Sequence, residues 1–120
     1  MARKSCAGYV PFKGMLSYRF HPAAAEELLE AGEYIKADDP EEGDLFKQDF
    51  AKALDWACSQ PLIFRCFDGD FRKVRAGKFR YSLVFRVWED EIQILAVAHM
   101  SQRPGYWKER AQNWPQSPLS

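Results

Sequence analysis

Two neighbouring stretches of the chain, Arg80-Tyr-Ser-Leu-Val-Phe-Arg-Val-Trp88 and Ile92-Gln-Ile-Leu-Ala-Val-Ala-His99, decide the fold. In the first, bulky apolar residues alternate with smaller or polar ones, and this period of two predicts a β-strand. The second is rich in branched and small apolar residues, and only Glu89-Asp90-Glu91 separates it from the first. Because so short a connection joins antiparallel neighbours, we expect a β-hairpin with Glu89-Asp90 as a two-residue turn.

The register of this hairpin follows from matching the apolar residues. With a two-residue turn Trp88 pairs with Glu91, and one side of the hairpin becomes uniformly apolar. That side would hold Val87 opposite Ile92, Phe85 opposite Ile94, Leu83 opposite Ala96 and Tyr81 opposite Ala98. A slip by one residue would mix the two faces, so we expect this register, with the apolar side under helices. Arg80 then lies directly across from His99.

A third strand, Phe71–Ala76, precedes the hairpin and is separated from it by Gly77-Lys78. If this loop also holds two residues, Arg75 pairs with Arg80 and Lys73 pairs with Ser82. The open face of the sheet would then gather most of the basic side chains of these strands. They are Lys73, Arg75, Arg80, Arg86 and His99.

The N-terminal half of the chain changes from strand to helix signals. A short strand is expected at Ser17–Phe20, and Pro22 is well placed as the first residue of a helix to about Ala37. Asp39 can cap a second helix that starts at Pro40 and ends before Pro61. With a short element at Tyr106–Arg110, the order predicts an α+β fold, β-α-α-β-β-β, with a helical hairpin on one face of a mainly antiparallel sheet.

Composition and charge limit the class of protein. The chain has 120 residues, 47% of them hydrophobic and 28% charged, which suits one globular domain. No apolar run approaches the length of a membrane span, and no signal peptide is recognisable. Three cysteines lack metal-ligand spacing, so we expect idle thiols rather than a disulfide or zinc site. We therefore expect a cytoplasmic protein without cofactor, metal or membrane contact.

The net charge of zero is a cancellation between segments. Residues 1–20 carry four bases and no acid, and residues 61–120 carry ten bases against six acids, so each segment has a charge of +4. Residues 21–60 carry eleven acids against three lysines, a charge of −8. The basic part could present a positive surface to phosphates, or the acids could simply coat two solvated helices.

The order of these features resembles the RelE/ParE toxin superfamily. The resemblance rests on Tyr18-Arg19-Phe20-His21-Pro22-Ala23-Ala24, the acidic helical hairpin, Lys73-Val74-Arg75 and Ile94–His99. The ending is similar to the ParE-like, plasmid stabilisation branch, and the match covers roughly Leu16 to Arg110. The residues of this ending are His99, Arg103, Pro104, Tyr106, Trp107 and Arg110.

The resemblance implies the toxin half of a type II toxin–antitoxin pair, which inhibits growth and forms a hetero-oligomeric complex with a cognate antitoxin. ParE-like members poison DNA gyrase, whereas RelE-like members cut mRNA on the ribosome as mRNA interferases. A third possibility is a degenerate member that only binds its antitoxin. The resemblance favours gyrase.

An RNA-cutting reaction needs a base, a cation on the phosphate and an acid for the leaving oxygen. His99 and Arg80 could supply the first two and are the candidate catalytic residues for a RelE-like activity. No Glu or Asp is expected beside them, and His99 could instead orient the tail through a backbone hydrogen bond.

The remaining candidates would bind nucleic acid or another target. Lys73, Arg75, Arg86 and Arg103 could contact phosphates or another target. Arg75 and Arg80 could instead be solvated strand arginines that resist edge pairing. Tyr106 and Trp107 could stack on a base or fold the tail back onto the sheet. The candidates lie in an expected toxin domain at 15–112, between a basic extension at 1–14 and a polar tail at 113–120. Met15 could be the natural start, or the extension could have a role of its own.

Overall fold

A computed structural model describes residues 16–114 of the chain. The expected extension at 1–14 and residues 115–120 of the tail lie outside the described residues. Nine elements follow one another along the described residues. They are β1 (Ser17–Phe20), α1 (Pro22–Asp38), α2 (Pro40–Ser59), the 3-10 helix η1 (Pro61–Ile63), β2 (Cys66–Asp68), β3 (Phe71–Arg75), β4 (Tyr81–Trp88), β5 (Glu91–His99) and α3 (Lys108–Gln112).

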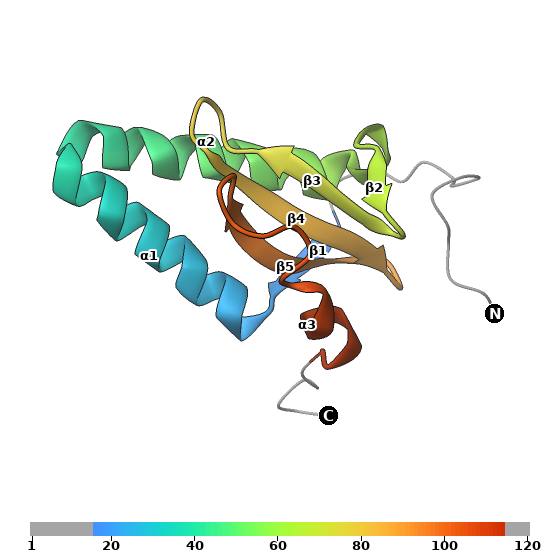
Figure 1. The fold of residues 1–120 in the computed structure, drawn as a ribbon. Helices are drawn as coiled ribbons and strands as arrows, with labels where there is room; N and C mark the ends of the chain where they lie inside the picture. Colours follow the sequence, from blue (N-terminus) through green and yellow to red (C-terminus); the bar gives the residue numbers. More distant parts are fainter. Residues whose placement is uncertain (1–15, 115–120) are drawn as a thin grey trace.

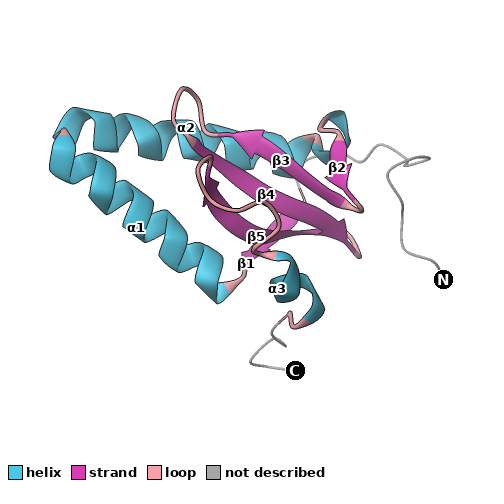
Figure 2. Cartoon of the chain, in the orientation of Figure 1, coloured by secondary structure: helices cyan, strands magenta, loops and turns pink. Residues whose placement is uncertain are grey.

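The strands form one sheet in the order β1-β5-β4-β3-β2 (Figure 1). Within the described residues only the β1–β5 pair is parallel, and the chain passes from β1 to β5 through the helical hairpin and the strands β2 to β4. The long helices form a hairpin whose turn projects beyond the sheet, and the short α3 lies near β5, at the other end of the chain (Figures 1 and 2). The predicted α+β architecture is therefore confirmed, with β2 and η1 as additional short elements.

The start of each long helix is set by its sequence. The His21 side chain accepts a hydrogen bond from the Ala23 N–H and so caps α1, and Pro22 follows as its first residue. Asp39 accepts from the Glu41 N–H in the same way and begins α2 after a one-residue connection. A connection this short makes the helices antiparallel.

The turn of the β4–β5 hairpin is confirmed. Glu89 and Asp90 have φ values of 49° and 67°, as a two-residue turn of this kind requires. Trp88 pairs with Glu91, and the predicted register holds as far as Phe85 opposite Ile94.

Beyond this point the predicted register is wrong, because β5 contains a bulge at Leu95. Val84 pairs with Ala96, so Leu95 is an extra residue on β5. Leu83 consequently lies opposite Val97 rather than Ala96, and the later side chains of β5 exchange faces. Tyr81, and not Arg80, is the partner of His99.

The loop between β3 and β4 also differs from the prediction. It holds residues 77–80 in addition to Ala76, whose N–H donates to the Tyr81 carbonyl. Arg75 therefore pairs with Ser82, and Lys73 pairs with Val84, each two residues from the predicted partner. Since the shift is even, the faces of β3 remain as predicted. Arg80 belongs to the loop instead of the strand.

Two apolar clusters lie on opposite faces of the sheet. The larger one packs the helical hairpin against the face that carries Leu83, Phe85 and Ile94, and it includes Phe46 and Phe50 from α2. A smaller cluster on the other face joins β4 and β5 to the C-terminal segment. It is formed by Val84, Leu95, Ala96 and Trp107, with Phe71, Ala98, Tyr106, Ala111 and Trp114 packed around them.

The two cysteines among the described residues differ in state. Cys58 is a buried free thiol, and burial, aided by Asp55, raises its pKa to about 11, so it is not reactive at neutral pH. Cys66 is in a disulfide bond. The expectation of idle thiols is confirmed for Cys58 and is wrong for Cys66.

Candidate functional site

Two of the three cations of β3, Lys73 and Arg75, are exposed on the face opposite the helices and are called the β3 cations below, whereas Arg72 is buried and donates to the Phe64 carbonyl. The Lys73 ammonium lies 4.9 Å from the ring centroid of Phe67. The Arg75 guanidinium donates to the carbonyls of Phe79 at 2.8 Å and Lys78 at 3.3 Å, which ties it to the loop that follows β3. Neither side chain has an ion pair with a carboxylate within residues 16–114. These two charges are therefore available to an anionic partner.

Arg86 shares this face but has a different environment. Its Nε donates to Gln93 Oε1 at 2.8 Å, and Gln93 in turn donates to Glu91 at 3.0 Å. The Arg86 guanidinium also lies 4.5 Å from the Trp88 ring centroid and donates to the Ala111 carbonyl. Arg86 therefore belongs to a hydrogen-bond network that crosses the sheet and reaches the C-terminal helix.

The same hydrogen-bond network ends in an ion pair between Glu91 and Arg19 of β1. Arg19 Nη2 lies 2.8 Å from Glu91 Oε2. Burial alone would raise the pKa of Glu91, but hydrogen bonds from Arg19 and Gln93 outweigh it and lower the pKa below its usual value. Glu91 is therefore ionised and cannot act as a general acid near neutral pH.

Glu27 of α1 ties the C-terminal segment to the sheet. Its carboxylate accepts from the Tyr106 hydroxyl at 2.9 Å and from both Nη atoms of Arg110, at 3.1 and 2.9 Å. It also accepts from the Val97 N–H at 3.0 Å, and Arg110 donates to the Leu95 carbonyl at 2.8 Å. These two backbone groups flank the bulge of β5, beyond the point where the pairing with β1 ends at Phe20. The side chains of Glu27 and Arg110 thus bind backbone groups of β5 at positions that β1 does not reach.

The C-terminal segment covers the middle of the sheet face. Trp107 is 3% exposed and contacts the rings of Phe67 and Phe71, at 5.8 and 4.8 Å between centroids. Tyr106 is half-buried against Arg110. Burial and the neighbouring Glu27 raise the pKa of the Tyr106 hydroxyl, so it stays protonated. Of the two readings for this aromatic pair, folding back onto the sheet is confirmed, and no base could reach the Trp107 ring without displacing the segment.

His99 lies on the helix side of the sheet, apart from the β3 cations. Its ring packs edge-on against Tyr81, with 4.9 Å between centroids. Nδ1 accepts from the Ser101 N–H at 3.0 Å and lies 2.7 Å from Ser101 Oγ. His99 therefore holds a turn, in the backbone-bonded role that was the alternative to catalysis, and the predicted convergence of His99 with Lys73 and Arg75 on one face is wrong. The physical reason is the extra residue at Leu95.

Arg80 and Arg103 lie in loops at the same end of the sheet. The Arg80 carbonyl accepts from the Met100 N–H at 2.8 Å, so its backbone extends the hairpin. The side chains of both arginines are exposed, with no hydrogen bond or ion pair inside the described part of the chain. They add to the β3 cations without forming an acid–base pair. Within residues 16–114 no group of His, Cys, Asp or Glu could hold a metal ion.

The chain was compared with known protein families and with curated proteins. A family model described as "ParE toxin of type II toxin-antitoxin system, parDE" matches residues 18–104. The chain belongs to the ParE toxin family. A comparison with curated proteins finds no match. Membership makes this ParE-family chain the toxin of a type II system and implies a cognate antitoxin as partner. No helix within residues 16–114 is long and apolar enough to cross a membrane.

Glu27 of the ParE-family chain is a contact residue that could not be recognised from the sequence. Glu27 was one of several acids on the first helix, and nothing local distinguished it from Glu26 or Glu30. Arg110 was noted only as part of the family-like ending. The contact joins residues 83 positions apart, so the signal that could have found it is a carboxylate on the helix face nearest β5 together with an arginine in the tail.

Proposed function

We propose that this chain inhibits growth by binding DNA gyrase, and that its antitoxin neutralises it. The observation that carries the proposal is the environment of His99. An RNA-cutting toxin needs a base and an acid beside the phosphate-binding cations. Here the histidine supports a turn on the opposite side of the sheet, and Glu91 and Glu27 are engaged by Arg19 and Arg110.

The exposed cations suit a binding function. Lys73, Arg75, Arg80 and Arg103 are exposed and unpaired with carboxylates. They lie at the margin of a sheet face whose middle is covered by Trp107. A surface of this kind offers complementary charge to an acidic protein or to DNA held by gyrase, without groups positioned for proton transfer.

A cleavage-complex assay tests the proposal directly. The full chain, made by cell-free synthesis, is added to purified gyrase and supercoiled plasmid, and linear DNA is measured after detergent and protease treatment. We expect linear DNA to increase with the amount of chain added. His99→Ala should behave like the unmodified chain, because its role in the turn is remote from the β3 cations. Absence of linear DNA with soluble chain would contradict the proposal.

Expression in cells separates this proposal from mRNA cleavage. We expect growth arrest, induction of the DNA-damage response and intact translated messages. Codon-positioned cuts that disappear in His99→Ala would instead assign an mRNA interferase. Normal growth with confirmed soluble protein would indicate a degenerate member that only binds its antitoxin.

A further inference from the structure

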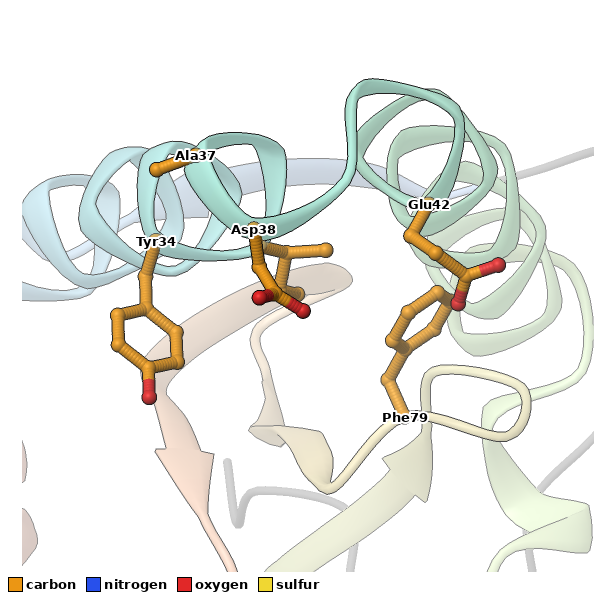
Figure 3. A pocket seen from close by; sticks show the side chains of 6 residues that line it. Tyr34, Ala37, Asp38, Glu42 and Phe79 are labelled. Carbon is orange, nitrogen blue, oxygen red and sulfur yellow. The ribbon is translucent and has the colours of Figure 1, made fainter.

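A pocket of about 580 Å³ lies where the helical hairpin meets the β3–β4 loop. Its walls come from the end of α1, the start of α2 and the loop that carries Phe79. Figure 3 shows the Asp38 carboxylate between the ring of Tyr34 on one side and Phe79 with Glu42 on the other. The lining is completed by Ile35 and Ala37. Its lining includes no residue of β3 or of the tail, although the Arg75 guanidinium donates to the carbonyl of the lining residue Phe79.

The lining groups combine aromatic rings with carboxylates. Tyr34 is 75% exposed, although it is a large ring beside a pocket. Within the described residues, the Asp38 carboxylate has no hydrogen bond or ion pair, and neither does the Tyr34 hydroxyl. An aromatic face attracts a cation through its quadrupole, and a carboxylate accepts hydrogen bonds from one. The chemistry of the lining therefore selects a positively charged side chain.

The chain itself shows how a cation is held beside this pocket. The Lys78 ammonium lies 3.0 Å from Glu42 Oε1 and 5.7 Å from the centroid of the Phe79 ring. Lys78 thus makes one carboxylate contact and one ring contact from the loop side. Asp38 and Tyr34 offer the same pair of groups on the other side, and there the pair is unoccupied by any side chain of the described residues.

The flat guanidinium of arginine fits this pair better than an ammonium does. A guanidinium can stack on an aromatic ring while its edge donates two hydrogen bonds to a carboxylate. The helices around the pocket carry most of the acidic residues of the chain. Their negative electrostatic potential attracts a basic segment from a distance. We propose that the pocket at the tip of the helical hairpin binds an arginine side chain of a partner protein, with Asp38 and Tyr34 as its main contacts.

This inference does not depend on whether gyrase is the target, and it is tested with short peptides. The ¹⁵N-labelled full chain is titrated with Ac-Gly-Arg-Gly-NH₂ while amide resonances are followed. The control peptide replaces arginine by citrulline, which keeps the shape of the side chain and removes its charge. We expect saturable shifts at Asp38 and Phe79 with a dissociation constant on the order of millimolar for the arginine peptide only.

Variants identify the groups responsible. Asp38→Asn and Tyr34→Ala should each weaken binding by about five-fold or more, because each removes one of the two contacts. Glu30→Gln removes an equal charge from an exposed position of α1 outside the pocket lining and should leave the affinity unchanged. Lys78→Met should strengthen binding, because it removes a competing positive charge and frees Glu42.

Three results would overturn the inference. The first is an absence of saturable shifts at the pocket, and the second is equal binding of the citrulline peptide. The third is an equal effect of Asp38→Asn and Glu30→Gln, which would indicate attraction to the acidic helices as a whole. Gyrase poisoning would be unaffected by any of these results.

Discussion

Glu27, on α1, accepts hydrogen bonds from the backbone of β5 and from two side chains of the C-terminal segment. One carboxylate accepts from β5, from Tyr106 and from Arg110, and its ion pair with Arg110 leaves each side chain only 18% exposed. A partly buried carboxylate that loses its charge leaves the guanidinium without its counter-ion. Glu27 therefore joins the C-terminal segment to β5 through polar contacts, beside the apolar packing of Trp107.

We expect Glu27→Gln to lower the free energy of unfolding by about 2 kcal/mol, because the amide keeps the size of the side chain but not the ion pair. Urea unfolding followed by tryptophan fluorescence measures the change. Glu30→Gln, an exposed exchange on the same helix, should change the free energy by less than about 0.5 kcal/mol. Equal effects of the two variants would refute this role of Glu27.

A second residue makes the stability depend on pH. His21 caps α1 through Nδ1, which must stay unprotonated to accept from Ala23. Burial lowers the pKa of His21, and the positive charge of Arg110 lowers it further. Because the pKa is lower in the folded chain than in the unfolded chain, the unfolded state takes up the proton first. The contribution of His21 is therefore complete above a pH of about 6.5 and is lost as the pH falls through the folded pKa.

The test compares unfolding by urea at pH 7.5 and pH 5 in the unmodified chain and in His21→Asn. Asparagine also caps helices but does not titrate in this range. We expect the variant to lose less stability between the two pH values. The other titratable groups are shared by both proteins, so an identical loss would assign the pH dependence to them.

At the scale of elements, Gly43 allows the close contact between α1 and α2, whereas Gly32 leaves room for a larger side chain. A Cβ added at Gly43 would lie 2.8 Å from Lys36 Cβ and 3.0 Å from Lys36 Cα, so the two helices touch there. A Cβ at Gly32 would meet nothing within 4 Å. The difference arises from packing, since both glycines lie inside helices.

We therefore expect opposite effects from the same exchange. Gly32→Ala should raise the free energy of unfolding by about 0.5–1 kcal/mol through helix propensity alone. Gly43→Ala should lower it by about 1 kcal/mol or more, because the helices must move apart. Thermal unfolding of both variants measures the two changes, and a gain at Gly43 would show that the hairpin separates without strain.

The sheet shows where prediction from sequence succeeds and where it stops. The alternation in Tyr81–Trp88 and the turn at Glu89-Asp90 were sufficient to predict the hairpin and its first pairs. The bulge was not predictable, because Leu95, Ala96 and Val97 are all apolar and buried, so the pattern is the same whichever face each one takes. The bulge moved His99 to the helix side of the sheet, and the longer β3–β4 loop placed Arg80 outside the strand.

At the scale of the whole molecule, the C-terminal segment completes the fold. Val84, Leu95 and Ala96 are at most 2% exposed, and the segment from Tyr106 to Trp114 covers them. An uncovered apolar face of a sheet attracts other molecules. The segment therefore covers the apolar face of the sheet and also binds Arg86 through the Ala111 carbonyl.

A truncated chain ending at Gly105 should expose this face. We expect strong binding of a hydrophobic dye and loss of solubility, whereas a chain that ends at Trp114 should behave like the full chain. Dye fluorescence and sedimentation measure the difference. Equal behaviour of the two truncated chains would mean that the cover contributes nothing to the fold.

The extra residue of β5 has a consequence for how such a sheet can change over generations. Losing or gaining one codon before His99 would exchange the faces of all later side chains in the strand without replacing any of them. A histidine that supports a turn could thus be brought among the arginines, or withdrawn from them, by a single in-frame deletion or insertion. Related genes that differ in length by one codon at this point would encode sheets with different chemistry on the same face.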